Sequence, residues 1–213
     1  MTERLEKIFS VIPKAKVFAD IGCDHGYIAK AMLDSGKCEK AIISDISKKC
    51  LKKAQELLDD YILKGLAESV VSDGFDKVVG ADVALIAGMG GEEICSILSG
   101  AENLPETLVL QPMKNPEKVR LLCLQKGYKT IKDSVFKSAG KFYDLIVLVK
   151  GEDSLTDEEI EFGRDNLDGK NSDFKGKLLI EINKINGYLE AENISIKTEK
   201  ELTARLEKYK KYV

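Results

Sequence analysis

The chain alternates between short apolar runs and segments whose apolar residues recur every three to four positions, the spacing of one helix face. The apolar runs predict strands at residues 17–20, 41–45, 69–72, 81–87 and 108–110. The periodic segments predict helices at residues 27–33, 48–64 and 92–98, a helix capped by Thr2 that ends before Pro13, and one between Asn115 and Gly127. Strands that alternate with helices in this way indicate an α/β protein.

Two further apolar runs, at residues 128–135 and 142–149, are separated by a connection that contains Gly140 and Lys141. They predict a pair of antiparallel strands at the edge of the sheet. The expected fold class is therefore a doubly wound, Rossmann-like α/β sheet. Ligands of such sheets bind beyond the carboxyl ends of the strands, so functional residues are expected at that edge.

The pattern changes after Gly151. Residues 155–168 are acidic and predict a linking helix. Two sets of apolar residues at spacings of three or four follow: Leu178, Ile182, Ile185 and Leu189, then Leu202, Leu206, Tyr209 and Val213. Such seams predict two helices that fold back as an antiparallel, coiled-coil-like hairpin. We therefore expect two domains, at residues 1–152 and 153–213. The hairpin has two open interpretations, a packing or dimerisation element and a substrate-binding element.

Charge is distributed unevenly along the chain. The net charge of −3 argues against a uniformly basic nucleic-acid-binding protein. Residues 110–150 nevertheless carry nine basic and three acidic side chains, whereas residues 151–169 carry one basic and eight acidic ones. A negative protein with this distribution can still present a positive face.

Composition excludes several classes of protein. No run of about 18 apolar residues is present, and the first seven residues alternate in charge, so neither a membrane span nor a signal peptide is expected. A cytoplasmic protein without a membrane partner is the expectation. Five scattered cysteines without a C-x-x-C pair and a single histidine, His25, predict neither a disulfide framework nor a metal site.

The first predicted strand leads into a glycine loop with carboxylates, Asp20-x-Gly22-x-Asp24-x-Gly26. Gly22 lets the backbone pass close beneath a ligand, because a Cβ would take up that space. The carboxylates of Asp20 and Asp24 would face positive groups, such as the ammonium and sulfonium of S-adenosylmethionine. A dinucleotide site also places glycines here, but this chain lacks the G-x-G pair of that motif.

Two further aspartates follow the next two predicted strands. Asp45 lies about 20 residues beyond the glycine loop, the offset expected for a carboxylate that accepts from ribose hydroxyls. Asp73, in the sequence Ser72-Asp73-Gly74-Phe75, is placed to accept from an adenine amino group. The alternative is that Asp and Gly are common turn residues after any strand. To explain this chain, the turn-residue alternative would have to hold after each of three successive strands, in the order that a cofactor site requires.

Five segments taken together resemble the bacterial tRNA (adenine-22-N1)-methyltransferase family. They are A-D-I-G-C-D-H-G-Y-I from Ala19, D-G-F from Asp73, I-A-G-M-G-G from Ile86, L-Q-P from Leu110 and G-K-F-Y-D-L-I from Gly140. The resemblance spans residues 4–149 in the right order. It implies a class I S-adenosylmethionine-dependent methyltransferase domain, followed by a helical, coiled-coil-like domain.

The glycine loop, the acidic strand ends and the A-G-M-G-G segment together indicate the S-adenosylmethionine site. The predicted cofactor-binding residues are Asp20, Gly22, Cys23, Asp24, Asp45, Ile46, Asp73, Gly74, Gly88 and Met89. Cys23 has the alternative role of a small residue that packs under the ligand.

The reaction that the resemblance implies is methyl transfer from S-adenosylmethionine to N1 of adenine 22 in tRNA. Adenine N1 carries a lone pair at neutral pH and needs no general base, so the site has mainly to hold two reactants in line. We predict that His25, Gln111 and Tyr143 lie near the target base. For His25 the alternative is a loop or helix-capping role, and for Tyr143 it is packing.

The predicted RNA-binding residues are Arg4, Lys114, Arg120 and Lys141. Phosphate contacts would explain these residues, and so would solvated helix faces. The alternatives for the whole chain are a methyltransferase acting on a small molecule or protein, and a non-catalytic RNA-binding protein that retains a cofactor pocket. The expected partner is tRNA, and the expected state is a monomer or weak homodimer.

Overall fold

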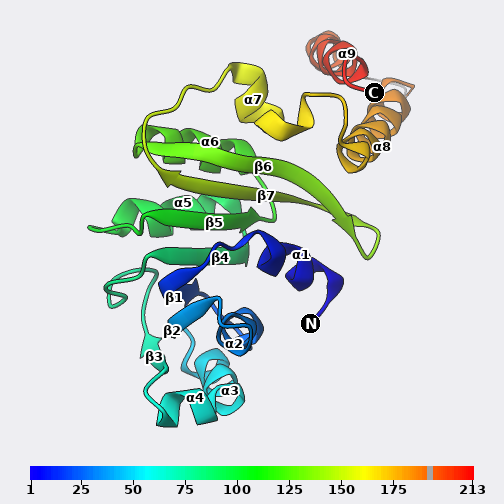
Figure 1. The fold of residues 1–213 in the computed structure, drawn as a ribbon. Coiled ribbons are helices and arrows are strands. Elements are labelled where there is room, and N and C mark those ends of the chain that lie inside the picture. The colour runs from blue at the N-terminus through cyan, green and yellow to red at the C-terminus, as the bar shows by residue number, and fades with distance from the viewer. Residues whose placement is uncertain (191–193) are drawn as a thin grey trace.

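The computed structural model describes residues 1–190 and 194–213. Its centre is a seven-stranded sheet in the order β3-β2-β1-β4-β5-β7-β6 (Figure 1). The strands are β1 Ala15–Ile21, β2 Cys38–Asp45, β3 Ala67–Val71, β4 Val83–Met89, β5 Thr107–Pro112, β6 Tyr128–Ser138 and β7 Lys141–Lys150. The first five are parallel, and β7 is antiparallel to both neighbours. The predicted doubly wound sheet with an antiparallel pair at its edge is confirmed.

Helices cover both faces of this sheet. The helices of the first 151 residues are α1 Glu3–Val11, α2 Tyr27–Asp34, α3 Lys48–Leu57, α4 Asp59–Leu63, α5 Gly91–Gly100 and α6 Pro116–Gln125. Buried residues of α1, α2 and α3 pack on one face, whereas those of α5 and α6 pack on the other. Each face therefore has its own apolar core, as the alternation of buried side chains along the strands requires.

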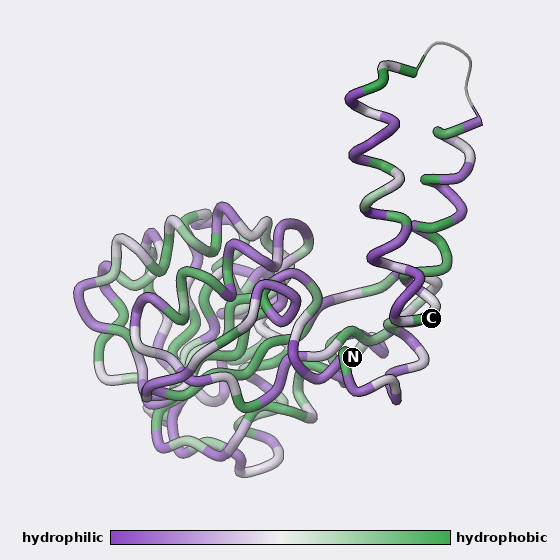
Figure 2. The backbone as a smooth tube through the Cα atoms, turned by 90° about the horizontal axis from the view of Figure 1, so that it is seen from above, coloured by the Kyte–Doolittle hydropathy of each residue, from purple (hydrophilic) through white to green (hydrophobic). Residues whose placement is uncertain are grey.

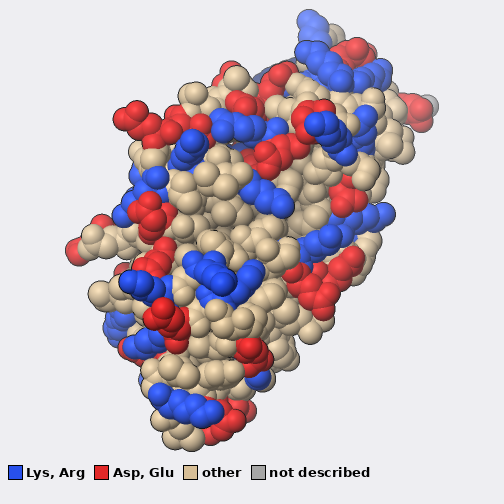
Figure 3. All heavy atoms as spheres, in the orientation of Figure 1, with Lys and Arg blue, Asp and Glu red and all other residues tan. Residues whose placement is uncertain are grey.

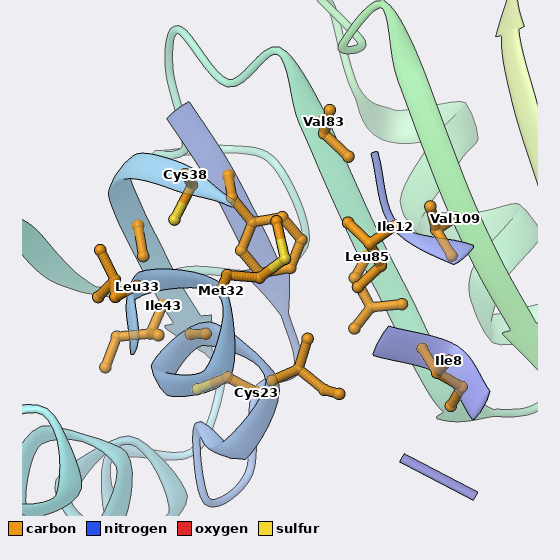
Figure 4. Packing of buried hydrophobic residues seen from close by; sticks show 14 of the residues in the cluster. Ile8, Ile12, Cys23, Met32, Leu33, Cys38, Ile43, Val83, Leu85 and Val109 are labelled. Carbon is orange, nitrogen blue, oxygen red and sulfur yellow. The ribbon is translucent and has the colours of Figure 1, made fainter. Parts of the chain in front are cut away.

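The first core fixes helix α1 across the middle of the sheet. Ile8 of α1 and Ile12 just after it are almost completely buried among Leu85 of β4, Val109 of β5 and their neighbours (Figure 4). Thr2 caps this helix by accepting from the Leu5 N–H, as its sequence predicts. The start of α1 thereby points toward the carboxyl ends of β4 and β5.

One predicted helix is divided in two. Residues 48–64 were expected to form a single helix, but α3 ends at Leu57 and α4 starts at Asp59. Leu58 between them is fully buried and has φ −107° and ψ 14°, outside the helical region. No Gly or Pro marks the break in the sequence. Because Leu58 packs with Ala54 in the core beside α2, tertiary packing rather than local propensity ends α3.

The C-terminal part of the chain forms the helical hairpin that the seams predict. The acidic segment contains α7 Asp157–Phe162 and a short 3-10 helix, Arg164–Asn166, rather than one helix throughout. Helices α8 Ser172–Leu189 and α9 Ile196–Lys210 then lie side by side and project from the main body (Figure 2). Ile182, Ile185 and Leu206 form the buried seam between them.

The segment after β7 also covers the exposed edge of β6. Side chains of this segment accept from the outward backbone N–H groups of β6: Asp153 from Thr130, Asp165 from Asp133, Asn166 from Val135 and Asp173 from Lys137, each at 2.9 Å. These four side chains take the place of a further strand. An edge with its N–H groups satisfied in this way cannot pair with another chain.

None of the helices within residues 1–190 and 194–213 combines the length and the apolar composition that crossing a membrane requires.

Candidate functional site

The predicted acidic residues of β1, β2 and β3 meet at one edge of the sheet because these strands are parallel and adjacent. Asp20 pairs with Ile43, and Asp45 pairs with Val71, so the loops that follow the three strands begin side by side. We call Asp20, Asp24, Asp45 and Asp73 the aspartate group. Asp24 and Asp73 are exposed, and Asp45 is half-buried.

The glycine loop is held against β2 by its backbone. The N–H groups of Gly22 and Cys23 both donate to the Ser44 carbonyl, at 2.8 and 3.0 Å. Gly22 has φ +69°, a conformation that favours glycine, and a Cβ there would stand 2.0 Å from Met89 Cε. The side chain of Met89 therefore lies directly over Gly22, which brings the tip of β4 together with that of β1.

Asp45 is oriented by two backbone donors. Its Oδ1 accepts from the Ser47 N–H at 2.8 Å, and its Oδ2 accepts from the Asp24 N–H at 3.4 Å. Each carboxylate oxygen has further acceptor capacity, because an ionised carboxylate has about four lone-pair sites. The side chain is thus fixed in place while it can still accept from a ligand.

Asp20 differs from the exposed strand ends because it is only 6% exposed. Burial raises the pKa of its carboxyl from 3.8 to about 7, a hydrogen bond from the Ala29 N–H opposes the shift, and the Asp45 carboxylate adds to it by repulsion. Asp20 therefore lies beneath the glycine loop, against the first turn of α2.

Cys23 and Ser44 also point away from solvent. Cys23 belongs to the core beside α2, and burial raises the pKa of its thiol far above the usual range. It fits the alternative role of a small packing residue. The Ser44 hydroxyl, 1% exposed, is the buried side-chain polar atom without a hydrogen-bond partner among the described residues. Such an orphan beside a strand end is a group that a ligand or water normally satisfies.

His25 stands at the exposed side of the glycine loop. Its ring stacks on that of Tyr27, with centroids 5.4 Å apart and an interplanar angle of 16°, and its Nε2 lies 3.7 Å from Asp24 Oδ2. Tyr27 was predicted only as the start of a helix, although an exposed aromatic ring two residues after His25 offers a stacking surface. The contacts of His25 lie within this loop, away from Gln111 and Tyr143.

A second cluster forms at the ends of β4, β5 and β7 around Arg4, which reaches over from α1. Arg4 Nη1 donates to Gln111 Oε1 at 3.0 Å and lies 3.7 Å from Met113 Sδ. The Arg4 guanidinium also stands 5.6 Å from the centre of the Tyr143 ring. We call Arg4, Gln111, Met113 and Tyr143 the Arg4 group.

Gln111 is buried by other protein groups, whereas Tyr143 is half-buried, and the contact of each with a target base stays a prediction. Gln111 is completely buried, and its Nε2 donates to the Pro112 carbonyl at 3.1 Å and to Met113 Sδ at 3.4 Å. Tyr143 stacks on Phe136, with ring centroids 5.5 Å apart, in addition to its contact with Arg4. Both the oxygen and the nitrogen of the Gln111 amide are thus bonded to protein groups. Gln111 and Tyr143 both contact Arg4.

The remaining predicted cofactor residues lie around the same edge. Ile46 is 69% exposed directly after Asp45. Gly74 has φ +52°, and a Cβ there would stand 2.8 Å from the side chain of Ile97 on α5. Gly88 has φ +82°, and a Cβ there would stand 3.6 Å from Arg4 Nη1. Gly88 therefore separates the aspartate group from the Arg4 group.

The predicted RNA-binding residues do not form one surface. Lys114 and Lys141 are exposed beside the Arg4 group, in the loop after β5 and at the start of β7.

The prediction for Arg120 was wrong, because this side chain is 1% exposed and donates to Asp133 at 2.7 and 2.9 Å and to Asp144 at 2.8 Å. Burial acts to lower the pKa of Arg120, and the two carboxylates more than offset it. Lys177 of α8 donates to the other oxygen of Asp144 at 2.8 Å.

Opposite charges are interleaved on the surface. Lys, Arg, Asp and Glu side chains alternate over the face drawn in Figure 3, with no broad area of one sign. The acidic segment after β7 accounts for part of this mixture of charges, because Asp153, Asp165 and Asp173 lie along β6 in the otherwise basic region. The basic excess of residues 110–150 is therefore partly neutralised by the segment that follows it.

A cavity of about 530 Å³ lies at the opposite, amino edge of the sheet, lined by residues that precede β4 and β5. It shares no residue with the aspartate group or the Arg4 group. Within the described residues, no cluster of three or more His, Cys, Asp or Glu side chains is arranged to hold a metal ion.

Comparison with known proteins agrees with this arrangement. A family model described as a methyltransferase domain matches residues 1–146. The tRNA (adenine(22)-N(1))-methyltransferase of Bacillus subtilis is 30% identical over 157 residues, which cover 71% of this chain and 66% of that protein. The crystal structure of the B. subtilis m1A22 tRNA methyltransferase is 25% identical, with a TM-score of 0.87, and covers 100% of this chain and 98% of that one.

A further solved structure, TrmK of M. capricolum in complex with the cofactor product S-adenosyl-homocysteine, is 26% identical with a TM-score of 0.89. The similarity covers 100% of this chain and 97% of that one, so it includes the C-terminal helices. The chain therefore belongs to the tRNA (adenine-22-N1)-methyltransferase family of class I S-adenosylmethionine-dependent methyltransferases.

Proposed function

We propose that this protein transfers a methyl group from S-adenosylmethionine to N1 of adenine 22 in tRNA. The observation that carries the proposal is family membership over the whole chain, together with acidic side chains at the ends of three adjacent parallel strands. The similar M. capricolum protein holds S-adenosyl-homocysteine, which supports the same cofactor here.

The chemistry of the aspartate group fits the polar groups of S-adenosylmethionine. Asp45 accepts from the ribose hydroxyls, because both its oxygens are oriented and retain acceptor capacity. Asp73 accepts from the adenine amino group, and Ile46 and Gly74 form the adjoining surface for the base. Asp20 and Asp24 attract the ammonium group, and the ionised state of Asp20 is favoured when that positive charge is close.

Glycines at two strand ends let the backbone approach the methionine part of the cofactor. Gly22 and Gly88 both adopt positive φ, and Met89 bridges from β4 to Gly22. The cofactor supplies an electrophilic methyl group on a sulfonium, and the chain supplies position. Binding holds the two reactants in line, so the entropy cost of bringing them together is met before the chemical step. Most of the rate enhancement originates from this positioning.

Proton transfer is not the main task of this site. Adenine N1 has a free lone pair, so its attack needs no base, and the residues around it have to expose the ring and stabilise the positive charge on the product. The His25–Tyr27 stack offers an aromatic surface at the mouth of the glycine loop, and Asp24 lies beside it. We assign the side chains of His25 and Tyr27 to the target base, in preference to the buried Gln111.

The tRNA is bound by the surface beside the Arg4 group. Arg4, Lys114 and Lys141 supply positive charge there, and phosphate contacts provide most of the affinity of such surfaces. The catalytic unit corresponds to residues 1–152, and residues 153–213 form the helical domain.

A direct assay tests this function. Purified protein is incubated with unmodified tRNA and labelled S-adenosylmethionine, and the methylated nucleoside is located by mass spectrometry. We expect 1-methyladenosine at position 22, and no product with a matched tRNA that carries guanine there. Methylation confined to a nucleic-acid-free extract would instead identify a small molecule or protein as the substrate. Absence of any methyl transfer, with intact tRNA binding, would indicate a non-catalytic RNA-binding protein.

A further inference from the structure

Arg4 is a cation held at the site, and among the described residues no carboxylate lies within 4.0 Å of its guanidinium. The guanidinium instead contacts the neutral amide oxygen of Gln111, the sulfur of Met113 and the ring of Tyr143. An Arg has five N–H donors, so most of them remain available. The Arg120 guanidinium, by contrast, is neutralised by Asp133 and Asp144.

The position of Arg4 is fixed by the fold. Ile8 lies one helical turn after Arg4, so both side chains project from the same face of α1. Ile8 is completely buried in the core that contains Val109 and Leu85 (Figure 4). Gln111 follows Val109 by two residues on the same face of β5, and this brings the Arg4 guanidinium to the carboxyl end of that strand.

Gln111 and Tyr143 then act as supports for the guanidinium. The buried Gln111 accepts from Arg4 while its own amide donates to Pro112 and Met113, which sets the direction of its Oε1. Tyr143 is held from the other side by its stack on Phe136. A flexible surface Arg loses rotamer freedom when it binds a ligand, whereas this side chain is already ordered.

We propose that Arg4 binds a phosphate that flanks the target nucleotide, with Gln111 and Tyr143 as its positioning residues. The inference rests on the proposed function. A guanidinium fits a phosphate by paired N–H donors, and a phosphate contact orients a nucleotide without reading its base. A fixed cation is unsuited to contact the methylated base, because the product carries positive charge.

The location of Arg4 favours a nucleotide phosphate over the carboxylate of the cofactor. The aspartate group occupies β1, β2 and β3, whereas the partners of Arg4 belong to β5, β7 and the loop after β5. Gly88 of β4 lies between the two groups. Arg4 thus stands at the border of the proposed cofactor site, on the side away from the aspartate group.

The first test compares Arg4→Gln and Arg4→Lys with the unaltered protein, and uses Lys16→Gln at the amino edge of the sheet as the control for loss of one charge. We expect Arg4→Gln to raise KM for tRNA by about tenfold or more, the size of one charge-assisted contact. The salt dependence of log Kd should flatten by roughly 0.7 to 0.9, one phosphate contact. Arg4→Lys should recover part of the KM effect, and Lys16→Gln should change neither quantity. Calorimetry should give the same affinity for S-adenosyl-homocysteine in all four proteins.

The second test replaces the phosphate itself. A tRNA with a neutral methylphosphonate on either side of adenine 22 should bind the unaltered protein about tenfold more weakly at one of the two positions. The same replacement should have no further effect on Arg4→Gln, which the unfolding temperature must show to be folded. Equal losses in both proteins, or a loss of cofactor affinity in Arg4→Gln, would overturn the inference. If the unaltered protein fails to methylate tRNA at all, the proposed function fails instead.

Discussion

The aspartate group and the Arg4 group lie at the same edge of one sheet but are assembled differently. The contacts of Asp45 join residues 2 and 21 positions apart, whereas those of Arg4 with Gln111 and Met113 join residues 107 and 109 positions apart. The first group follows directly from strands that each end in an acidic loop. The second group exists only because α1 packs across β4 and β5. Local motifs thus build the proposed cofactor side, and long-range packing builds the proposed phosphate-binding side.

The largest expected effect is a loss of stability when the buried cation Arg120 is removed. Arg120→Met leaves Asp133 buried without a cation and Asp144 with Lys177 alone, and it should destabilise the protein by about 3 to 5 kcal/mol. Urea unfolding measures this. Lys118→Met, on the same helix but with an exposed partner in Glu92, is the matched control and should leave stability nearly unchanged.

Arg120→Met also discriminates between the two groups below its unfolding temperature. Asp144 adjoins Tyr143 in β7, so tRNA binding should weaken while affinity for S-adenosyl-homocysteine is retained. Equal weakening of both would mean that the two groups share one support.

The next effect concerns the aspartate group alone. Asp45→Ala removes the oriented carboxylate, and affinity for S-adenosyl-homocysteine should fall by about 10- to 100-fold, since hydrogen bonds to a charged group are worth about 1.5 to 3 kcal/mol. Calorimetry measures the change, with Asp60→Ala as an exposed acidic control. Affinity for tRNA should stay the same. A normal cofactor affinity would show that Asp45 does not hold the ribose.

A pH effect is expected from Asp20. The folded pKa of this carboxyl, about 7, is above the value of 3.8 for a free aspartate. Between these values the folded state binds more protons than the unfolded state, so this residue lowers stability as pH rises from about 4 to 7. Thermal unfolding of the ligand-free protein should therefore show a decline over this range that is smaller in Asp20→Asn. Identical pH profiles would place the Asp20 carboxyl in a more hydrated setting.

The smallest effect is expected at the exposed border of the Arg4 group. Lys114→Ala should weaken tRNA binding about two- to fivefold and flatten the salt dependence by less than Arg4→Gln does, because a solvated lysine is a mobile point charge. Filter binding at several salt concentrations measures both. A larger loss in Lys114→Ala than in Arg4→Gln would reverse the assigned importance of the two residues.

The sequence predicts most of the sheet because strands and helices have local signatures. The order of elements, the antiparallel pair at one edge and the two helices of the C-terminal hairpin agree with the structure. Within the predicted seams, Leu178 packs instead with Val135 and Phe162, and Val213 is exposed. The single helix predicted at residues 48–64 is an exception. Leu58 at the break has high helix propensity, and its burial beside α2 accounts for the end of α3.

The burial of charged residues was the feature hardest to predict. Arg120 lies in a segment rich in basic residues, which favours an exposed phosphate ligand, yet it is neutralised inside the protein by residues 13 and 24 positions away. The local sequence around Gln111 likewise does not show that Arg4 donates a hydrogen bond to its amide oxygen. Sequence patterns show where apolar and polar residues alternate, but they do not show which distant side chain pairs with a buried charge.

The sequence by itself determined the α/β alternation, the glycine loop and the acidic residues after three strands, because each depends on hydrophobic period and on turn residues within a few positions. Tertiary structure alone decided that Asp20 is buried, that Arg120 is internal and that Arg4 stands over the ends of β4 and β5. The physical reason is that burial and ion pairing depend on what packs nearby in space, and in this chain those partners come from as far apart in the sequence as Arg4 and Tyr143.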